Sequence, residues 1–328
     1  MVRTLICVGA LASILLFVAY IFFSEQAPVA GERISGTELN NQKKVWTEII
    51  RRKGSQEAYQ LFLTQAPQNT EIDTHTHAHL FGEALYETDG LEGISICDDS
   101  FAFGCYHSFL GSAIYHEGIE TLPLFDKACT DIYGSKNLPC QHGIGHGVLV
   151  YTGYDDLVGA LDLCRIISER PTGGCSSGIF MEYNFHTMES SRGADYLRPL
   201  TENPYAPCDS LPDLYQSSCY YEQIHWWLNV YSGDVQTIAL LCTELAPESD
   251  IRTACFNGIG HYVTANADYN YDTIVSTCSL MPDEQTRGLC HEGASWLMIS
   301  KTEHTEEAYQ LCDVLPEPYT TSCLKKLN

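Results

Sequence analysis

The sequence lacks most of the motifs by which enzymes and nucleic-acid-binding proteins are recognised. It has no phosphate-binding loop, no dinucleotide-binding glycine fingerprint and no visible Ser-His-Asp arrangement. Basic residues are scarce, because 18 Lys and Arg stand against 42 Asp and Glu, giving a net charge of −24. Since nucleic acids are bound through clusters of Lys and Arg, this balance argues against a nucleic-acid partner.

The 15 cysteines contain no Cys-x-x-Cys pair, which argues against a zinc ribbon. Instead they mark a repeat. The stretch CQHGIGHG at 140–147 recurs in weaker form along the chain at steps of about 35 residues, a period typical of helical-hairpin arrays. We call the cysteine that opens each copy the leading cysteine. The leading cysteines are Cys105, Cys140, Cys175, Cys219, Cys255, Cys290 and Cys323.

A second cysteine ends an amphipathic run 8 to 13 residues before each leading cysteine. Pairing each with the next leading cysteine uses fourteen of the fifteen thiols and leaves only Cys7. The expected disulfides are Cys97–Cys105, Cys129–Cys140, Cys164–Cys175, Cys208–Cys219, Cys242–Cys255, Cys278–Cys290 and Cys312–Cys323. Sequence alone does not prove a connectivity, but paired cysteines in this number indicate an oxidising compartment.

Hairpins of about 36 residues, with one cysteine ending the second helix and another starting the next unit, resemble the cysteine-rich Sel1-like repeats, relatives of the tetratricopeptide arrays. The resemblance covers roughly 55–323 and implies the fold class, with no partner or activity. We therefore predict an all-α protein: an α-solenoid, or a closed toroid, of about seven disulfide-linked helical hairpins. The first unit starts near Asp73, which takes the place of a leading cysteine.

The N-terminus predicts a membrane segment. Residues 4–23 contain no charge, and their length suits a helix that crosses a bilayer. We expect a signal anchor at 1–24, a solvated juxtamembrane linker or helix at 25–54, and a helical-repeat ectodomain at 55–328. The chain would then be membrane-anchored and extracytoplasmic, at a cell surface or in a periplasm; if the segment is instead a cleaved signal peptide, the protein is secreted.

Histidines concentrate at two positions of the repeat, the second and sixth after each leading position. These positions are four residues apart and so share one helix face. Seven of the twelve histidines occupy them. Five of these belong to the first three units: His75, His79, His107, His142 and His146. Later units add His225 and His261 at the sixth position.

Two interpretations of these histidines remain open. Duplicated units inherit residues, so the shared positions can be structural. Alternatively, imidazoles on neighbouring helices about 8–10 Å apart converge on a metal ion. Because the thiols are used in disulfides, the ligands would be imidazoles with a carboxylate, which suits a transition metal such as Zn, Cu or Fe. Glu83 and Glu117 are nearby candidates for that carboxylate, either as a metal ligand or as the hydrogen-bond partner of a ligand.

Three functions follow from these patterns. The first is binding of a transition metal by the five histidines, with metal-dependent catalysis an open question. The second is a scaffold that binds a protein or peptide, with structural histidines. The third is a pH sensor built on clustered imidazoles. Two further expectations concern structure: the aromatic residues around Cys219 are core, and the glycines three residues after leading cysteines, such as Gly178, face a neighbouring helix backbone.

Overall fold

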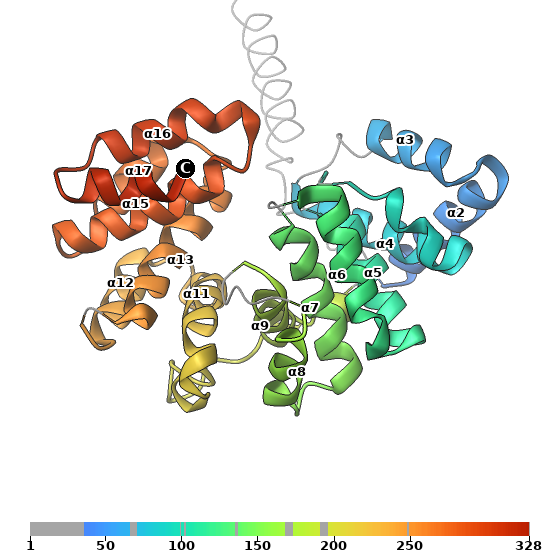
Figure 1. Cartoon of the computed structure of the whole chain (residues 1–328), viewed down its shortest axis with the longest axis horizontal. Coiled ribbons are helices and arrows are strands. Elements are labelled where there is room, and N and C mark those ends of the chain that lie inside the picture. The colour runs from blue at the N-terminus through green and yellow to red at the C-terminus, as the bar shows by residue number, and fades with distance from the viewer. Residues whose placement is uncertain are drawn as a thin grey trace, which may run out of the picture. The chain divides into compact units, whose positions relative to one another are not determined.

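The computed structural model describes residues 36–65, 71–98, 100–101, 103–134, 137–167, 173–190, 196–247 and 249–327. All regular secondary structure in these ranges is helical, and Gly36–Asn328 forms one compact unit (Figure 1). The membrane segment expected at 1–24 lies outside the described residues, as does Cys7. Within the described ranges, no helix combines the length and apolar character that crossing a bilayer requires.

The longer helices that carry the leading positions pack in chain order, each against the next. They are α4 (Glu71–Asp89), α5 (Gly104–Glu117), α7 (Leu138–Thr152), α9 (Cys175–Phe185), α11 (Asp213–Val230), α13 (Asp250–Asn266), α15 (Glu284–Met298) and α17 (Tyr319–Leu327). Figure 1 shows this succession from α4 to α15. Histidines at equivalent positions of successive units therefore lie on neighbouring helices.

Connecting helices of 8 to 12 residues lie between these, and α9 and α17 of the first set are of similar length. The connecting helices are α6 (Leu122–Tyr133), α8 (Leu157–Cys164), α12 (Val235–Glu244), α14 (Tyr271–Cys278) and α16 (Thr305–Asp313). Three of them begin at a side-chain cap, because Asp156, Asp234 and Asn270 each accept a hydrogen bond from the backbone three residues on. The unit that begins near Asp73 has only a 3₁₀ segment here, Gly90–Ser95, and the unit at Cys175 has the single turn α10 (Thr187–Ser190).

All seven expected disulfides are present, which confirms the pairing rule. Each joins a connecting segment to the following long helix, as Cys164 at the end of α8 does with Cys175 at the start of α9. The loops they close span 8 to 13 residues. Seven such bonds indicate that the protein folds in an oxidising, extracytoplasmic compartment.

For the stretch before the first repeat, where a solvated linker or a helix was expected, the described part is helical and packs against the body. Residues Gly36–Lys53 form α2, which packs against α4, and Ser55–Gln65 form α3. The ring of Trp46 on α2 lies 5.2 Å from Phe62 and 5.6 Å from Phe81. Because the partly buried Trp46 packs on two buried rings, α2 is part of the folded body, and the compact unit begins at Gly36 and not at residue 55.

The long insertion between α9 and α11 is also packed against the body where it is described. The guanidinium of Arg198 lies 3.6 Å from the ring centroid of Trp226, and its Nε donates to Asn184 Oδ1 at 2.7 Å. The indole of Trp226 donates in turn to the carbonyl of Arg198 at 2.7 Å. As expected, the aromatic residues around Cys219 are core: Tyr220, Tyr221, Trp226 and Trp227 are all buried.

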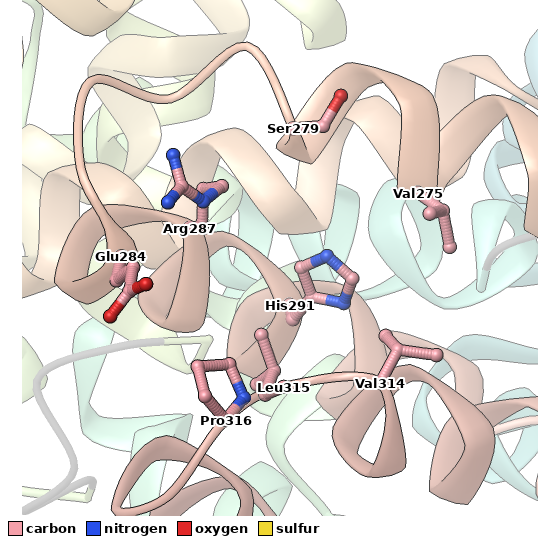
Figure 2. Close-up of a pocket in the computed structure, with 8 residues that line it drawn as sticks. All are labelled: Val275, Ser279, Glu284, Arg287, His291, Val314, Leu315 and Pro316. Atoms are coloured by element: carbon pink, nitrogen blue, oxygen red, sulfur yellow. The ribbon is translucent and has the colours of Figure 1, made fainter.

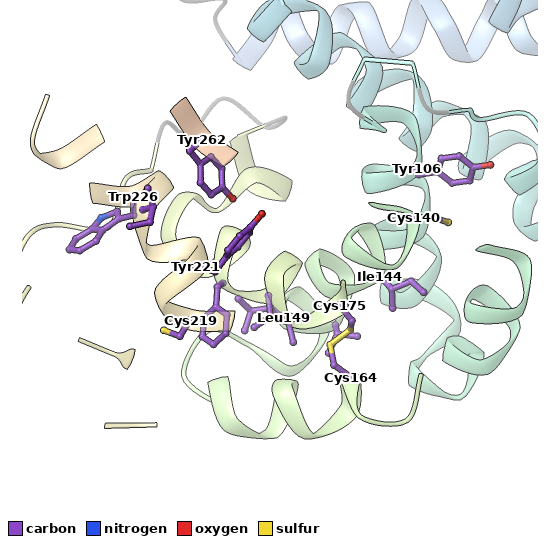
Figure 3. Packing of buried hydrophobic residues seen from close by; sticks show 14 of the residues in the cluster. Tyr106, Cys140, Ile144, Leu149, Cys164, Cys175, Cys219, Tyr221, Trp226 and Tyr262 are labelled. Atoms are coloured by element: carbon purple, nitrogen blue, oxygen red, sulfur yellow. A yellow bond between two sulfur atoms is a disulfide. The ribbon is translucent and has the colours of Figure 1, made fainter. Parts of the chain in front are cut away.

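Glycines allow the long helices to touch backbone to backbone. A Cβ added to Gly178 on α9 would overlap the carbonyl oxygen of His142 on α7, and one added to Gly145 on α7 would overlap that of Cys175 on α9. Around this contact the buried residues form one continuous hydrophobic core that includes Ile144 (Figure 3). The expectation that these glycines face a neighbouring helix backbone is therefore confirmed at Gly178.

Candidate metal site

Three histidines from two helices converge at the start of the repeat region. His75 and His79 are four residues apart on α4, and His107 comes from the adjacent α5. One nitrogen from each ring lies within 4.8 Å of the other two. The ring centroids of His75 and His79 are 4.5 Å apart, and those of His75 and His107 are 5.3 Å apart. We call these residues the histidine triad.

Close contact between α4 and α5 sets this spacing. A Cβ added to Gly82 on α4 would overlap the carbonyl oxygen of Cys105 on α5. One added to Gly104 on α5 would lie 2.9 Å from the carbonyl oxygen of His75. Because neither position tolerates a side chain, the two main chains approach more closely than ordinary helices do, and His107 reaches the pair on α4.

A hydrogen bond determines the tautomer of one imidazole of the triad, that of His75. The carbonyl of Phe101 can only accept, so the Nδ1–H of His75 donates to it at 2.7 Å. The Nε2 atom of His75 therefore keeps its lone pair. Nε2 of His79 and Nδ1 of His107 are buried and have no hydrogen-bond partner. Buried nitrogens without a partner are unfavourable by about 1–3 kcal/mol each, so the site has the character of one that receives a ligand.

The surroundings keep these imidazoles neutral. Burial lowers the pKa of His79 and of His107 well below the ordinary value, and the neighbouring histidines lower both further. Burial also lowers the pKa of His75, although the hydrogen bond to Phe101 partly opposes it. Since a metal ion binds the neutral imidazole, the folded chain holds the triad in the protonation state that coordination needs.

A second pair of histidines, His142 and His146, lies beside the triad on α7. The ring of His107 lies between the two groups, 5.4 Å from His142 and 5.1 Å from His146. His146 is fully buried, and its Nδ1 lies 2.9 Å from Glu182 Oε2 on α9. The sequence-predicted set of five histidines is thus one connected cluster, of which three satisfy the distances of a single metal site.

Glu182 is the carboxylate of the cluster, and sequence reasoning missed it. Burial alone would raise its pKa, but the hydrogen bond and charge of His146 outweigh burial, together with hydrogen bonds from Thr187 and Tyr154, and the pKa is lowered. Tyr154 donates to Oε1 at 2.7 Å. An ionised Glu182 can only accept, so His146 donates through Nδ1, and in the neutral form of its ring the lone pair is on Nε2. That Nε2 is buried without a hydrogen-bond partner.

The two acidic residues proposed from sequence have other contacts. Glu83 forms an ion pair with Lys43 at 3.3 Å, and Glu117 accepts a hydrogen bond from Tyr86 at 2.9 Å. Glu182 could have been found from its position in the repeat. It comes directly after the sixth position of the unit that follows the one with His142 and His146. Position relative to the neighbouring helix was a better guide than nearness along the chain.

His225 and His261 lie on α11 and α13, in a different aromatic environment. The ring of His225 stacks on Tyr262 at 4.8 Å, and that of His261 lies 5.4 Å from Tyr221. Burial lowers the pKa of His225 to about 4 and that of His261 to about 3. Nδ1 of each is also buried without a hydrogen-bond partner, but these two histidines are not among the three whose nitrogens converge.

A cavity of about 200 Å³ lies elsewhere, between α14, α15 and α16 (Figure 2). Its walls are mixed: Val275, Val314 and Leu315 are apolar, whereas Glu284 and Arg287 are charged. The one imidazole that lines it, that of His291, donates through Nδ1 to the carbonyl of Leu311 at 2.8 Å. With one imidazole, this cavity does not bring together three metal-binding side chains as the triad does.

Comparison with known proteins finds no counterpart: no family model, curated protein or solved structure matches this chain. The function is therefore argued from the site alone. Zinc and similar ions form bonds of about 2.0–2.1 Å to imidazole nitrogen, which places ligand nitrogens about 3.3 Å apart in a tetrahedral site. Nitrogens already within 4.8 Å reach that spacing by small side-chain rotations. The triad could therefore hold a metal ion.

Proposed function

We propose that this protein is an extracytoplasmic metal-binding protein that holds a transition metal ion through His75, His79 and His107. The observation that carries the proposal is the convergence of three neutral imidazoles, with two buried nitrogens that lack any hydrogen-bond partner. Imidazole ligands favour Zn, Cu, Fe or Ni over Ca or Mg. Three protein ligands leave a coordination position for water, an arrangement that catalytic zinc sites share.

The proposal includes the architecture around the site. The in-order packing of long helices, linked by disulfides at a period of about 35 residues, supports an α-solenoid of hairpins similar to the cysteine-rich Sel1-like repeats. The uncharged stretch at 4–23 supports a membrane anchor that presents the repeats on the extracytoplasmic side. A protein- or peptide-binding scaffold is the rival, and it requires no metal.

Metal analysis of the full-length protein, purified in detergent, tests the proposal. We expect stoichiometric transition metal in the wild-type protein and its loss in the double variant His79→Ala/His107→Ala. His116→Ala is the matched control, because His116 lies on the same helix as His107 but is exposed. This control should keep the metal. A metal-free wild-type protein that also fails to take up Zn, Cu, Fe or Ni on dialysis would leave the scaffold as the function.

A thermal melt gives an independent measurement. An ion that binds only the folded state stabilises it by about 2.7 kcal/mol when its free concentration is 100 times Kd. Addition of zinc should therefore raise the Tm of the apo wild-type protein and of His116→Ala. The Tm of His79→Ala/His107→Ala should stay where it is. An equal rise in all three proteins would place binding elsewhere on this acidic chain.

A further inference from the structure

A metal ion at the triad leaves a buried nitrogen of the adjacent histidine pair unexplained. Nε2 of His146 has no hydrogen-bond partner, and the Nδ1–H bond to Glu182 points its lone pair away from that carboxylate. Metal-ligating histidines are commonly held in this way, with the second nitrogen donating to a carboxylate. Glu182 is itself fixed, because the backbone N–H of Met188 donates to both of its oxygens, at 3.2 and 3.1 Å.

The geometry on this side of His107 repeats that of the triad. His142 and His146 are four residues apart on α7, as His75 and His79 are on α4, and their ring centroids are 4.9 Å apart. His107 lies 5.4 and 5.1 Å from this pair and 5.3 and 5.6 Å from the other. The central helix α5 packs on both α4 and α7.

Only one histidine of α5 is available to both pairs. The sixth position of its unit is Gly111, where an added Cβ would overlap the side chain of Met188 and lie 3.8 Å from the main chain of Gly147 on α7. If each pair is to take its third protein ligand from α5, both must use His107. An imidazole has two nitrogens on opposite sides of its ring and so can serve two ions.

We propose that the cluster holds two transition-metal ions, one at His75 and His79 and one at His142 and His146, with His107 bridging them through its two nitrogens. This inference rests on the proposed function of the triad. Binding of the second ion releases the remaining N–H proton of His107 to solvent, and the ring becomes an imidazolate that donates one lone pair to each ion. Glu182, which is hydrogen-bonded to His146, adds a buried negative charge that offsets the charge of the second ion.

The nitrogens of the triad lie within 4.8 Å of one another, and among the described residues they form the one such group. The second ion therefore draws His142 and His146 together by side-chain rotation as it binds. The triad should fill first and the second position after it, which predicts two unequal steps in a titration.

Copper(II) loading of the full-length protein in detergent tests the bridge, with copper counted by elemental analysis and unpaired spins by EPR integration. Imidazolate-bridged copper(II) ions couple antiferromagnetically, so we expect two coppers per chain and far fewer than two spins at low temperature. His142→Ala/His146→Ala should bind one copper with one full spin. His107→Gln, which keeps most of the side-chain volume, should remove the coupling, and His116→Ala should change neither count.

Each result decides between the proposals. Two coppers with two full spins would overturn the bridge through His107. One copper in the wild-type protein, still present in His142→Ala/His146→Ala, would overturn the second ion and leave the triad site standing. No bound copper, zinc, iron or nickel would overturn the metal-binding function itself. Circular dichroism and a count of free thiols show that each variant keeps its helices and its seven disulfides.

Discussion

The buried imidazole of His146 on α7 donates a hydrogen bond to the buried carboxylate of Glu182 on α9 across 2.9 Å. The bond joins two consecutive repeat units and connects the histidine cluster to the next long helix. It sets which nitrogen of His146 faces the cluster. In the proposed two-metal cluster, Glu182 would thus orient a ligand without binding an ion itself.

Glu182→Gln should weaken metal binding at His142 and His146 by about 10- to 100-fold, because the carboxylate behind a ligand histidine orients the ring and raises its basicity. The amide oxygen of Gln can still accept from Nδ1, so the effect should be larger in Glu182→Leu. Competition with a coloured chelator measures the affinity. Glu292→Gln is the control, since Glu292 is also buried but pairs with Lys326. Equal losses in Glu182→Gln and Glu292→Gln would contradict the orienting role.

Gly178→Ala should destabilise the protein by about 1–3 kcal/mol, because the new methyl group overlaps the carbonyl oxygen of His142 and the helices must move apart. Urea denaturation gives the change in the free energy of unfolding. Gly111→Ala is a matched control in another long helix, where the overlapping atoms are the mobile end of Met188. It should change stability much less, since Ala also favours the helix by about 1 kcal/mol over Gly.

Removal of the last disulfide by Cys312→Ser/Cys323→Ser should lower stability by about 2–3 kcal/mol, the value expected for a loop of this length. The metal content should not change, because α16 and α17 carry no residue of the cluster. Removal of Cys129–Cys140 is the comparison, since Cys140 lies two residues before His142 on α7. That variant should also bind metal more weakly, which chelator competition detects. Identical metal affinities in the two variants would contradict the link between this disulfide and the site.

Glu222 should make stability depend on pH near neutrality. Burial raises the pKa of its carboxyl from 4.5 to about 7, against the opposing hydrogen bonds of Tyr262 and Ser177. A raised pKa means that the folded state holds the proton more tightly than the unfolded chain does. Its contribution to the free energy of unfolding is complete below pH 4.5 and is lost as pH rises through 7. Since a pKa difference of one corresponds to about 1.4 kcal/mol, the total change is about 3 kcal/mol.

The measurement compares wild-type protein with Glu222→Gln by urea denaturation at pH 5 and pH 8. Buried histidines add a pH dependence of opposite sign, but it is common to both proteins and cancels in the difference. We expect the wild type to lose stability relative to the variant on going to pH 8. Tyr262→Phe removes a hydroxyl that lowers this pKa, so it should enlarge the loss. A pH-independent difference would contradict the raised pKa.

The sequence predicted the repeat phase because the same cysteine pattern recurs along the chain. Cysteines such as Cys164 and Cys175 reveal the period and the disulfide pairing at once. From that phase, residues four apart near the start of α4 are known to share a face, so His75, His79 and His107 were found without coordinates. Their convergence needed only that neighbouring units pack side by side.

Other features depend on contacts between units, which a single unit does not encode. Glu182 reaches His146 because α7 and α9 touch through Gly145 and Gly178, and the depth of that contact determines which side chain arrives. Trp46 was assigned to a solvated linker because its partners, Phe62 and Phe81, lie in later helices. In both cases the residue is visible in the sequence, but its contact partner is determined by how the helices pack.

The contact of Gly82 with Cys105 has a consequence for which ions the proposed site would accept. Main chains that already touch cannot come closer, and the disulfide Cys97–Cys105 at the start of α5 limits their separation. The gap between the imidazoles of α4 and α5 is then adjustable only by side-chain rotation, over a narrow span. Ions of small radius with short bonds to nitrogen suit such a gap, whereas large ions with long bonds would have to push two helices apart.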